Sequence, residues 1–142
     1  MTVNDDRVFR GGLHPVHAIL LSGTIPLFLG GLLSDLAYSS SYQIEWSNFA
    51  SWLIAAGLVF GGFALLWAII DLIRADRRGG HLIVYMLLLL ATWVVGFVNA
   101  LTHAKDAYAT MPMGLILSVI VVLLALASTW IGFAKFGVGG GR

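Results

Sequence analysis

The motif His14-Pro15-Val16-His17 places two imidazoles three residues apart at the start of a long apolar stretch. Side chains at i and i+3 project from neighbouring positions on one helical face, so both histidines point the same way. Neutral imidazole is a good ligand for haem iron and transition metals. His81 should lie at a similar depth on another helix. His14 or His17 could therefore clamp a b-type haem with His81, and the three histidines with Asp71 could hold a divalent metal.

The same residues also have a simpler interpretation. Histidine and proline are natural where a membrane helix emerges into the lipid head groups, and Pro15 suits a first helical turn because its missing N–H costs nothing there. Asp71 precedes Arg74 by three residues, which is the spacing of a salt bridge along one helix face. Both interpretations of these side chains stay open at the level of the sequence.

A second polar group is expected at the opposite ends of the same apolar segments. It consists of Asp35, Asn99 and His103. An ionisable side chain near the bilayer centre costs at least about 2.5 to 3.5 kcal/mol on insertion scales, so such residues face protein and have partners. The group predicts either a hydrogen-bonded contact between helix ends or a proton relay.

Helical periodicity predicts which of these residues share a face. At about 100° per residue, positions eighteen apart return to the same side, which pairs His17 with Asp35 and His81 with Asn99. One stripe runs along the third apolar segment and comprises His81, Tyr85, Thr92, Gly96, Asn99 and His103. This stripe should face protein, as a route for a cofactor or protons or as a row of interhelical hydrogen bonds.

The elements that position these side chains follow from composition. Of the 142 residues 59% are hydrophobic and 11% charged, and the mean hydropathy is +0.92, far from the values of soluble domains. Four segments can each cross about 30 Å of hydrocarbon, at about 14–38, 47–73, 81–103 and 112–136. Almost nothing remains for a soluble domain, so residues 1–142 are interpreted as one integral membrane domain.

Backbone groups in hydrocarbon need internal partners, so uninterrupted apolar segments must be helices, and short connections make neighbouring helices antiparallel. The predicted fold is all-α, an up-down-up-down bundle of four transmembrane helices. Arginines and lysines gather on the two tails and between the second and third segments, and only Lys105 falls on the other side. The positive-inside rule therefore predicts that both termini are cytoplasmic.

Several classes of function are disfavoured. The chain has no cysteine, which excludes disulfides and thiolate or iron–sulfur chemistry. The net charge of +1 and the dispersed basic residues give no case for nucleic acid. No nucleophile and base occupy a plausible pocket, so we expect no self-contained enzyme. Glycines at helix-contact spacing, such as Gly57 and Gly61, make homo-oligomerisation a further expectation.

The motif His14-Pro15-x-His17, followed by Asp35 at the end of the first segment and His81 after the basic loop, resembles a family of small bacterial membrane proteins catalogued as domain of unknown function 2231. The resemblance extends over nearly the whole chain. It implies a four-helix bundle in the bacterial inner membrane and frequent company with redox proteins, including periplasmic quinone-dependent sugar dehydrogenases. A third histidine expected from relatives is missing at Leu21-Ser22-Gly23, which weakens a metal site on the first helix.

The favoured hypothesis is a small multi-pass subunit that serves a periplasmic dehydrogenase as a redox-associated membrane anchor or as a haem b electron-transfer module. The alternative is a structural or assembly protein that braces a larger complex in the lipid bilayer. A chromophore bound by His14, His17 or His81 would distinguish them. Apart from haem b, no cofactor is expected. Transport ranks last, because that function would need broken helices or charges at the midplane.

Overall fold

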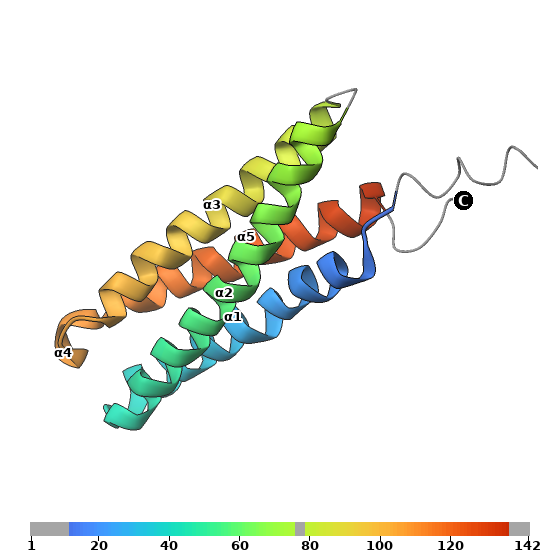
Figure 1. Ribbon diagram of the computed structural model, residues 1–142. Helices are drawn as coiled ribbons and strands as arrows, with labels where there is room; N and C mark the ends of the chain where they lie inside the picture. The colour runs from blue at the N-terminus through green and yellow to red at the C-terminus, as the bar shows by residue number, and fades with distance from the viewer. Residues whose placement is uncertain (1–11, 76–78, 137–142) are drawn as a thin grey trace, which may run out of the picture.

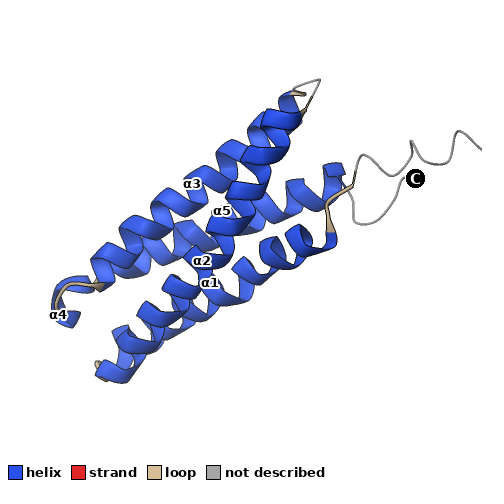
Figure 2. Cartoon of the chain, viewed as in Figure 1, coloured by secondary structure: helices blue, strands red, loops and turns tan. Residues whose placement is uncertain are grey.

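The computed structural model describes residues 12–75 and 79–136, which form long helices joined by short connections, with no β-strand among them (Figure 2). The helices in chain order are α1 (Pro15–Ser41), α2 (Ile44–Arg74), α3 (Gly80–His103), the one-turn α4 (Ala107–Thr110) and α5 (Met113–Phe136). All except α4 are long and apolar enough to cross a membrane. The predicted all-α fold with four spanning helices is confirmed.

The four long helices form a closed ring of neighbours (Figure 1). Extensive contacts join α1 to α2, α2 to α3, α3 to α5 and α5 to α1. Consecutive long helices run antiparallel, so α1 and α3 run parallel on one diagonal of the bundle. The start of α1, the end of α2, the start of α3 and the end of α5 lie at one end of the bundle, which we call the tail end. The opposite end, which carries α4, is called the α4 end.

The connection between α1 and α2 is shorter than the sequence predicts. Helix α1 continues to Ser41, past the predicted end at residue 38, and α2 already begins at Ile44. The hydroxyl of Ser41 donates to the carbonyl of Ala37 at 2.7 Å, and serines on the preceding turn make similar bonds. Tyr42 then ends the helix in the left-handed conformation with φ 54°, and its N–H donates to the carbonyl of Tyr38. These local bonds supply the partners that keep a polar serine run helical.

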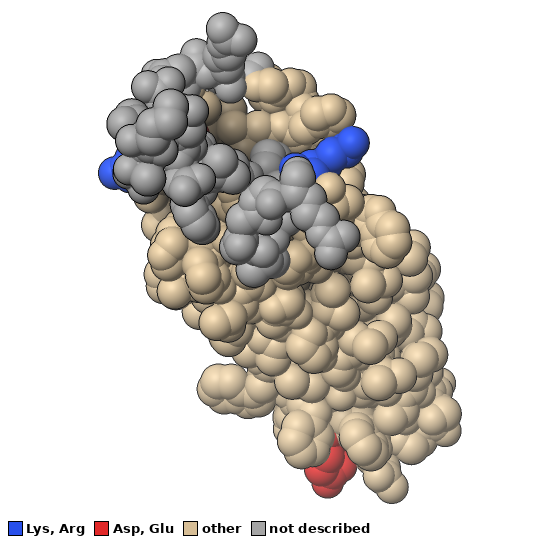
Figure 3. Space-filling view, turned by 90° about the vertical axis from the view of Figure 1, so that its right-hand side faces the viewer, with Lys and Arg blue, Asp and Glu red and all other residues tan. Residues whose placement is uncertain are grey.

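The exposed charged side chains of the described residues keep to the two ends of the bundle, as the face in Figure 3 shows. Arg74 ends α2 and Lys135 lies in the last turn of α5, both at the tail end. Glu45 lies in the first turn of α2, at the α4 end. The surface between these ends is apolar, with exposed leucine, isoleucine, valine and phenylalanine side chains. Such an uncharged band matches the hydrocarbon layer of a bilayer.

Glycines allow the helices of one chain to approach closely. A Cβ at Gly57 of α2 would lie 2.7 Å from the ring of Phe28, and one at Gly96 of α3 would lie 3.5 Å from the same ring. Phe28 is 3% exposed, so its ring fills the space that both glycines leave. A Cβ at Gly23 of α1 would meet Phe60 at 2.5 Å. Gly23, Gly57 and Gly96 therefore serve contacts between helices of the same chain.

Candidate functional site

Two clusters of buried polar side chains lie inside the bundle, one toward each end. The cluster nearer the tail end centres on His17 of α1, which is 1% exposed. Its Nε2 lies 2.6 Å from the hydroxyl oxygen of Tyr85 on α3, also 1% exposed. This hydrogen bond crosses the diagonal of the bundle. It fits there because Gly132 of α5 leaves room: a Cβ at that position would lie 3.0 Å from the Tyr85 ring.

The other histidine of the motif has a different environment. His14 is exposed and forms the N-cap of α1, where its Nδ1 accepts the N–H of Val16 at 3.2 Å. Its ring stacks on Trp67 of α2 with centroids 5.0 Å apart. Trp67 also meets the edge of His17, at 5.9 Å. The motif therefore starts the helix with one histidine and places the other in the core.

His81 and Asp71 are not buried with this cluster. Both side chains are exposed, His81 in the first turn of α3 and Asp71 near the end of α2. Among residues 12–75 and 79–136 the only ion pair is that between Asp35 and His103, so the predicted salt bridge from Asp71 to Arg74 is wrong. The α2 end lies in water or head groups, where an isolated surface pair gains little.

The cluster nearer the α4 end is more completely connected. Asp35 of α1 is fully buried, and its Oδ1 lies 2.7 Å from Nε2 of His103 on α3. Its Oδ2 accepts the hydroxyl of Ser118 on α5 at 2.5 Å. That hydroxyl oxygen in turn accepts the side-chain N–H of Asn99 at 2.9 Å. Three helices therefore meet on one carboxylate.

The protons of this cluster can be assigned by chemistry. Nδ1 of His103 lies 2.9 Å from the backbone carbonyl of Asn99 and must donate, because a carbonyl oxygen can only accept. One proton then remains between Nε2 of His103 and Oδ1 of Asp35. On the histidine it makes an imidazolium and carboxylate pair; on the aspartate it makes two neutral groups. Either way the pair has no net charge, which lowers the cost of placing it in hydrocarbon.

A third polar contact lies between the two clusters on the same face of α3. The hydroxyl oxygens of Thr92 and Ser128 on α5 are 3.2 Å apart. Each hydroxyl oxygen also lies 2.7 Å from a carbonyl one turn earlier in its own helix, at Leu88 and Leu124. Because a hydroxyl has one hydrogen, only a hydroxyl that does not donate to its own helix can donate across the contact. The predicted stripe of α3 therefore faces protein from Tyr85 to His103, and only its first member, His81, lies outside.

Sequence reasoning grouped Asp35, Asn99 and His103, and the structure brings these three together. Sequence reasoning missed Ser118, the second partner of the Asp35 carboxylate, and Trp67, whose ring contacts both histidines of the motif. A signal for Ser118 existed, because a hydroxyl inside an apolar span needs a hydrogen-bond partner within the protein. No signal pointed to Trp67, since an aromatic residue near a helix end is equally natural at the membrane interface.

The described residues can be tested for a haem or metal site. Nε2 of His17, the atom that would ligate iron, is bonded to Tyr85, and His81 is exposed at the helix start. These positions do not fit a haem clamped inside the bundle between His17 and His81. In the described part of the chain, no group of three or more histidine, aspartate or glutamate side chains could hold a metal ion. The alternative metal site with Asp71 is therefore not formed.

The fold and its buried contacts define an integral membrane four-helix bundle whose polar side chains point inward and whose apolar surface faces lipid. Residues 13–138 match a family described as a predicted membrane protein, DUF2231. The chain belongs to this family, which the His-Pro-x-His motif had suggested. No curated protein and no solved structure shows significant similarity to the chain.

Proposed function

We propose that the protein is a non-catalytic subunit of the bacterial inner membrane that anchors a periplasmic redox enzyme, with both termini in the cytoplasm. The observation that carries the proposal is the use of the buried histidines. His17 and His103 both close contacts between α1 and α3, at 2.6 and 2.7 Å. Side chains held in this way brace a bundle and are not free to ligate a cofactor.

The orientation rests on the charges at the ends. Arg74 and Lys135 lie at the tail end, where basic residues are retained on the cytoplasmic side. The α4 end would then face the periplasm and meet the enzyme. Tyr108 of α4 is 77% exposed there, and an exposed aromatic ring is a common anchor of a protein interface. The proposal that the partner is a redox enzyme rests on the family resemblance of the motif His14-Pro15-Val16-His17.

A fractionation experiment tests the anchoring role. Sugar dehydrogenase activity with a soluble quinone acceptor is measured in the membrane and soluble fractions of cells with and without this chain. We expect the membrane-bound share of the activity to fall without the chain and to return with the wild type. Tyr108→Ser should restore it poorly, whereas Tyr42→Ser at the neighbouring loop serves as the matched control. An unchanged distribution would favour a structural brace without a redox partner.

An absorption spectrum tests the electron-carrier form of the hypothesis. His14 and His81 are both exposed at the tail end, so a haem b held by them would lie at the surface of the bundle. The protein purified in detergent is scanned as isolated, after dithionite and after haem addition. The anchor proposal predicts no Soret band in the protein as isolated, and after haem addition only the absorption of free haem, which gel filtration removes from the protein. A band with sharp reduced α and β peaks that is lost in His81→Ala would contradict it and make the protein an electron carrier.

A further inference from the structure

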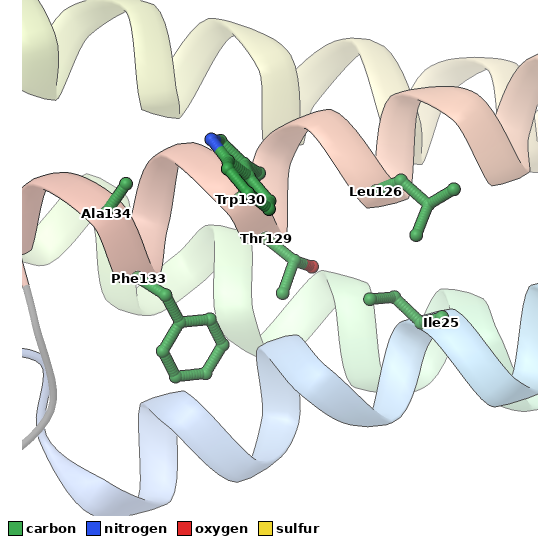
Figure 4. A pocket seen from close by; sticks show the side chains of 6 residues that line it. All are labelled: Ile25, Leu126, Thr129, Trp130, Phe133 and Ala134. Atoms are coloured by element: carbon green, nitrogen blue, oxygen red, sulfur yellow. The ribbon is translucent and has the colours of Figure 1, made fainter.

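A groove of about 410 Å³ lies between α1 and α5 on the surface that faces lipid. Its walls are apolar and include Ile25 of α1 and Leu126, Trp130 and Phe133 of α5. Figure 4 shows one exception, Thr129, whose side chain points from α5 toward α1 with its hydroxyl oxygen in the groove. The groove therefore combines an apolar lining with one polar side chain, whose hydroxyl oxygen is covered by neighbouring protein atoms.

That hydroxyl has no hydrogen-bond partner in the described part of the chain, although Thr129 is only 7% exposed. The neighbouring Ser128 donates to the carbonyl of Leu124 at 2.7 Å, and Thr92 and Thr102 of α3 make the same kind of bond. Most hydroxyls inside these helices are satisfied in this way. The Thr129 hydroxyl is left with a free donor in a place without water, where an acceptor from outside the chain would be stabilised.

The depth of Thr129 limits what can supply the acceptor. It precedes the end of α5 at Phe136 by seven residues, which is about 10 Å along the helix axis. Phospholipid phosphates stay in the head-group region, outside the hydrocarbon core. No charged side chain lines the groove, so an anionic head group would find no partner. The acceptor must be a neutral atom on a molecule that dissolves in hydrocarbon.

The neighbouring rings indicate a flat ligand. Phe133 lines the groove beside Thr129, and Trp130 is 77% exposed next to it. We propose that this groove binds a lipid-soluble ring carbonyl compound of the quinone class, and that the side chains covering the Thr129 hydroxyl shift so that a ring carbonyl accepts its hydrogen bond. The hydrocarbon tail of the ligand would follow the groove toward Leu126. This inference does not depend on the anchoring role, because it involves neither the α4 end nor the buried histidines.

A second groove supplies a matched control. It lies between α2 and α3, measures about 560 Å³ and is lined by Val59, Phe63 and Trp93 among others. The indole N–H of Trp93 in this groove already donates to the carbonyl of Leu58 at 3.2 Å. It is therefore larger, and its lining has one more aromatic residue, but it has no unpaired donor among the described residues. A ligand attracted only by apolar surface would enter this groove as readily as the first.

Binding can be measured with the full chain in nanodiscs by titrating decylubiquinone and following the quenching of tryptophan fluorescence. Thr129→Val removes the hydroxyl and keeps the shape, and we expect the Kd to rise roughly 3- to 10-fold, the value of one hydrogen bond. Thr129→Ser keeps the hydroxyl and should bind like the wild type. Decylbenzene, which has the tail and a ring but no carbonyl, should not compete.

Filling each groove separates specific binding from partition into the bilayer. Ile25→Phe narrows the groove between α1 and α5 and should abolish saturable quenching, whereas Val59→Phe in the control groove should leave it unchanged. Equal effects of the two variants would overturn the proposal, because binding would then be general apolar partition. Binding lost in Ile25→Phe but unaffected by Thr129→Val would also overturn it, since the groove would then accept an acyl chain and not a carbonyl.

Discussion

His103 of α3 holds the carboxylate of Asp35 at 2.7 Å across the diagonal of the bundle. The bond between Tyr85 of α3 and His17 of α1 repeats this relationship at the tail end, with the same sequence separation of 68 residues. On each helix the two levels are eighteen residues apart, which is five turns and about 27 Å. Because α1 and α3 run parallel, a single alignment of the two helices along their axes brings both pairs of side chains into contact.

Breaking the Asp35 contact should strongly destabilise the protein. Asp35→Ala leaves His103 and the hydroxyl of Ser118 buried without the carboxylate, and removal of one partner from a buried pair costs about 3 to 5 kcal/mol. Unfolding in mixed micelles, followed by circular dichroism, measures the loss. Asp71→Ala is the control, because this exposed carboxylate has no ion pair with any residue that the structure describes, and its removal should change stability by less than about 0.5 kcal/mol.

The double variant Asp35→Leu with His103→Leu separates two energies. One is the cost of leaving a buried group without its partner, and the other is the stabilisation that the pair itself contributes. We expect it to be more stable than Asp35→Ala, because no unpaired ionisable group remains in the core. The stability loss of the double variant is compared with the sum of the losses in Asp35→Leu and His103→Leu. Equal values would show that the two side chains contribute independently, contrary to the contact seen here.

Tyr85→Phe should cost about 1 to 2 kcal/mol. The substitution keeps the ring and removes the hydroxyl that lies 2.6 Å from Nε2 of His17. Nδ1 of this buried histidine already has no hydrogen-bond partner among the described residues, so both ring nitrogens would then be unpaired. The same micelle unfolding assay measures the effect. Tyr108→Phe, at an exposed tyrosine, should be neutral. If His17→Phe removed the effect of Tyr85→Phe in the double variant, the loss would be assigned to the hydrogen bond between them.

Gly57→Ala should destabilise the bundle by about 1 to 3 kcal/mol, because the added methyl would lie 2.7 Å from the buried ring of Phe28 and force it to shift. Gly80→Ala is the matched control, since a Cβ there meets nothing within 4 Å. Thermal unfolding of both variants in the same detergent checks the difference. Equal melting temperatures would mean that the contact between α1 and α2 is looser than described.

The contact between Thr92 and Ser128 should matter far less than the two diagonal pairs. Ser128→Ala removes one hydroxyl of a 3.2 Å contact, but the hydroxyl of Thr92 keeps its bond to the carbonyl of Leu88 at 2.7 Å. Interhelical hydrogen bonds of this kind contribute about 0.6 kcal/mol on average. A loss above about 2 kcal/mol in the micelle assay would contradict this ranking of the polar contacts.

The sequence alone determined the four spans, because the length and hydropathy of a segment decide whether it can cross hydrocarbon. It also determined that the stripe from Tyr85 to His103 faces protein, since helical periodicity places these residues on one side. The tertiary structure decided the partners. His17 bonds to Tyr85 and does not meet His81, and Asp35 takes Ser118 as well as His103. Periodicity specifies a face within one helix, whereas a contact depends on the rotation and register of two helices, which packing around glycines and large side chains decides.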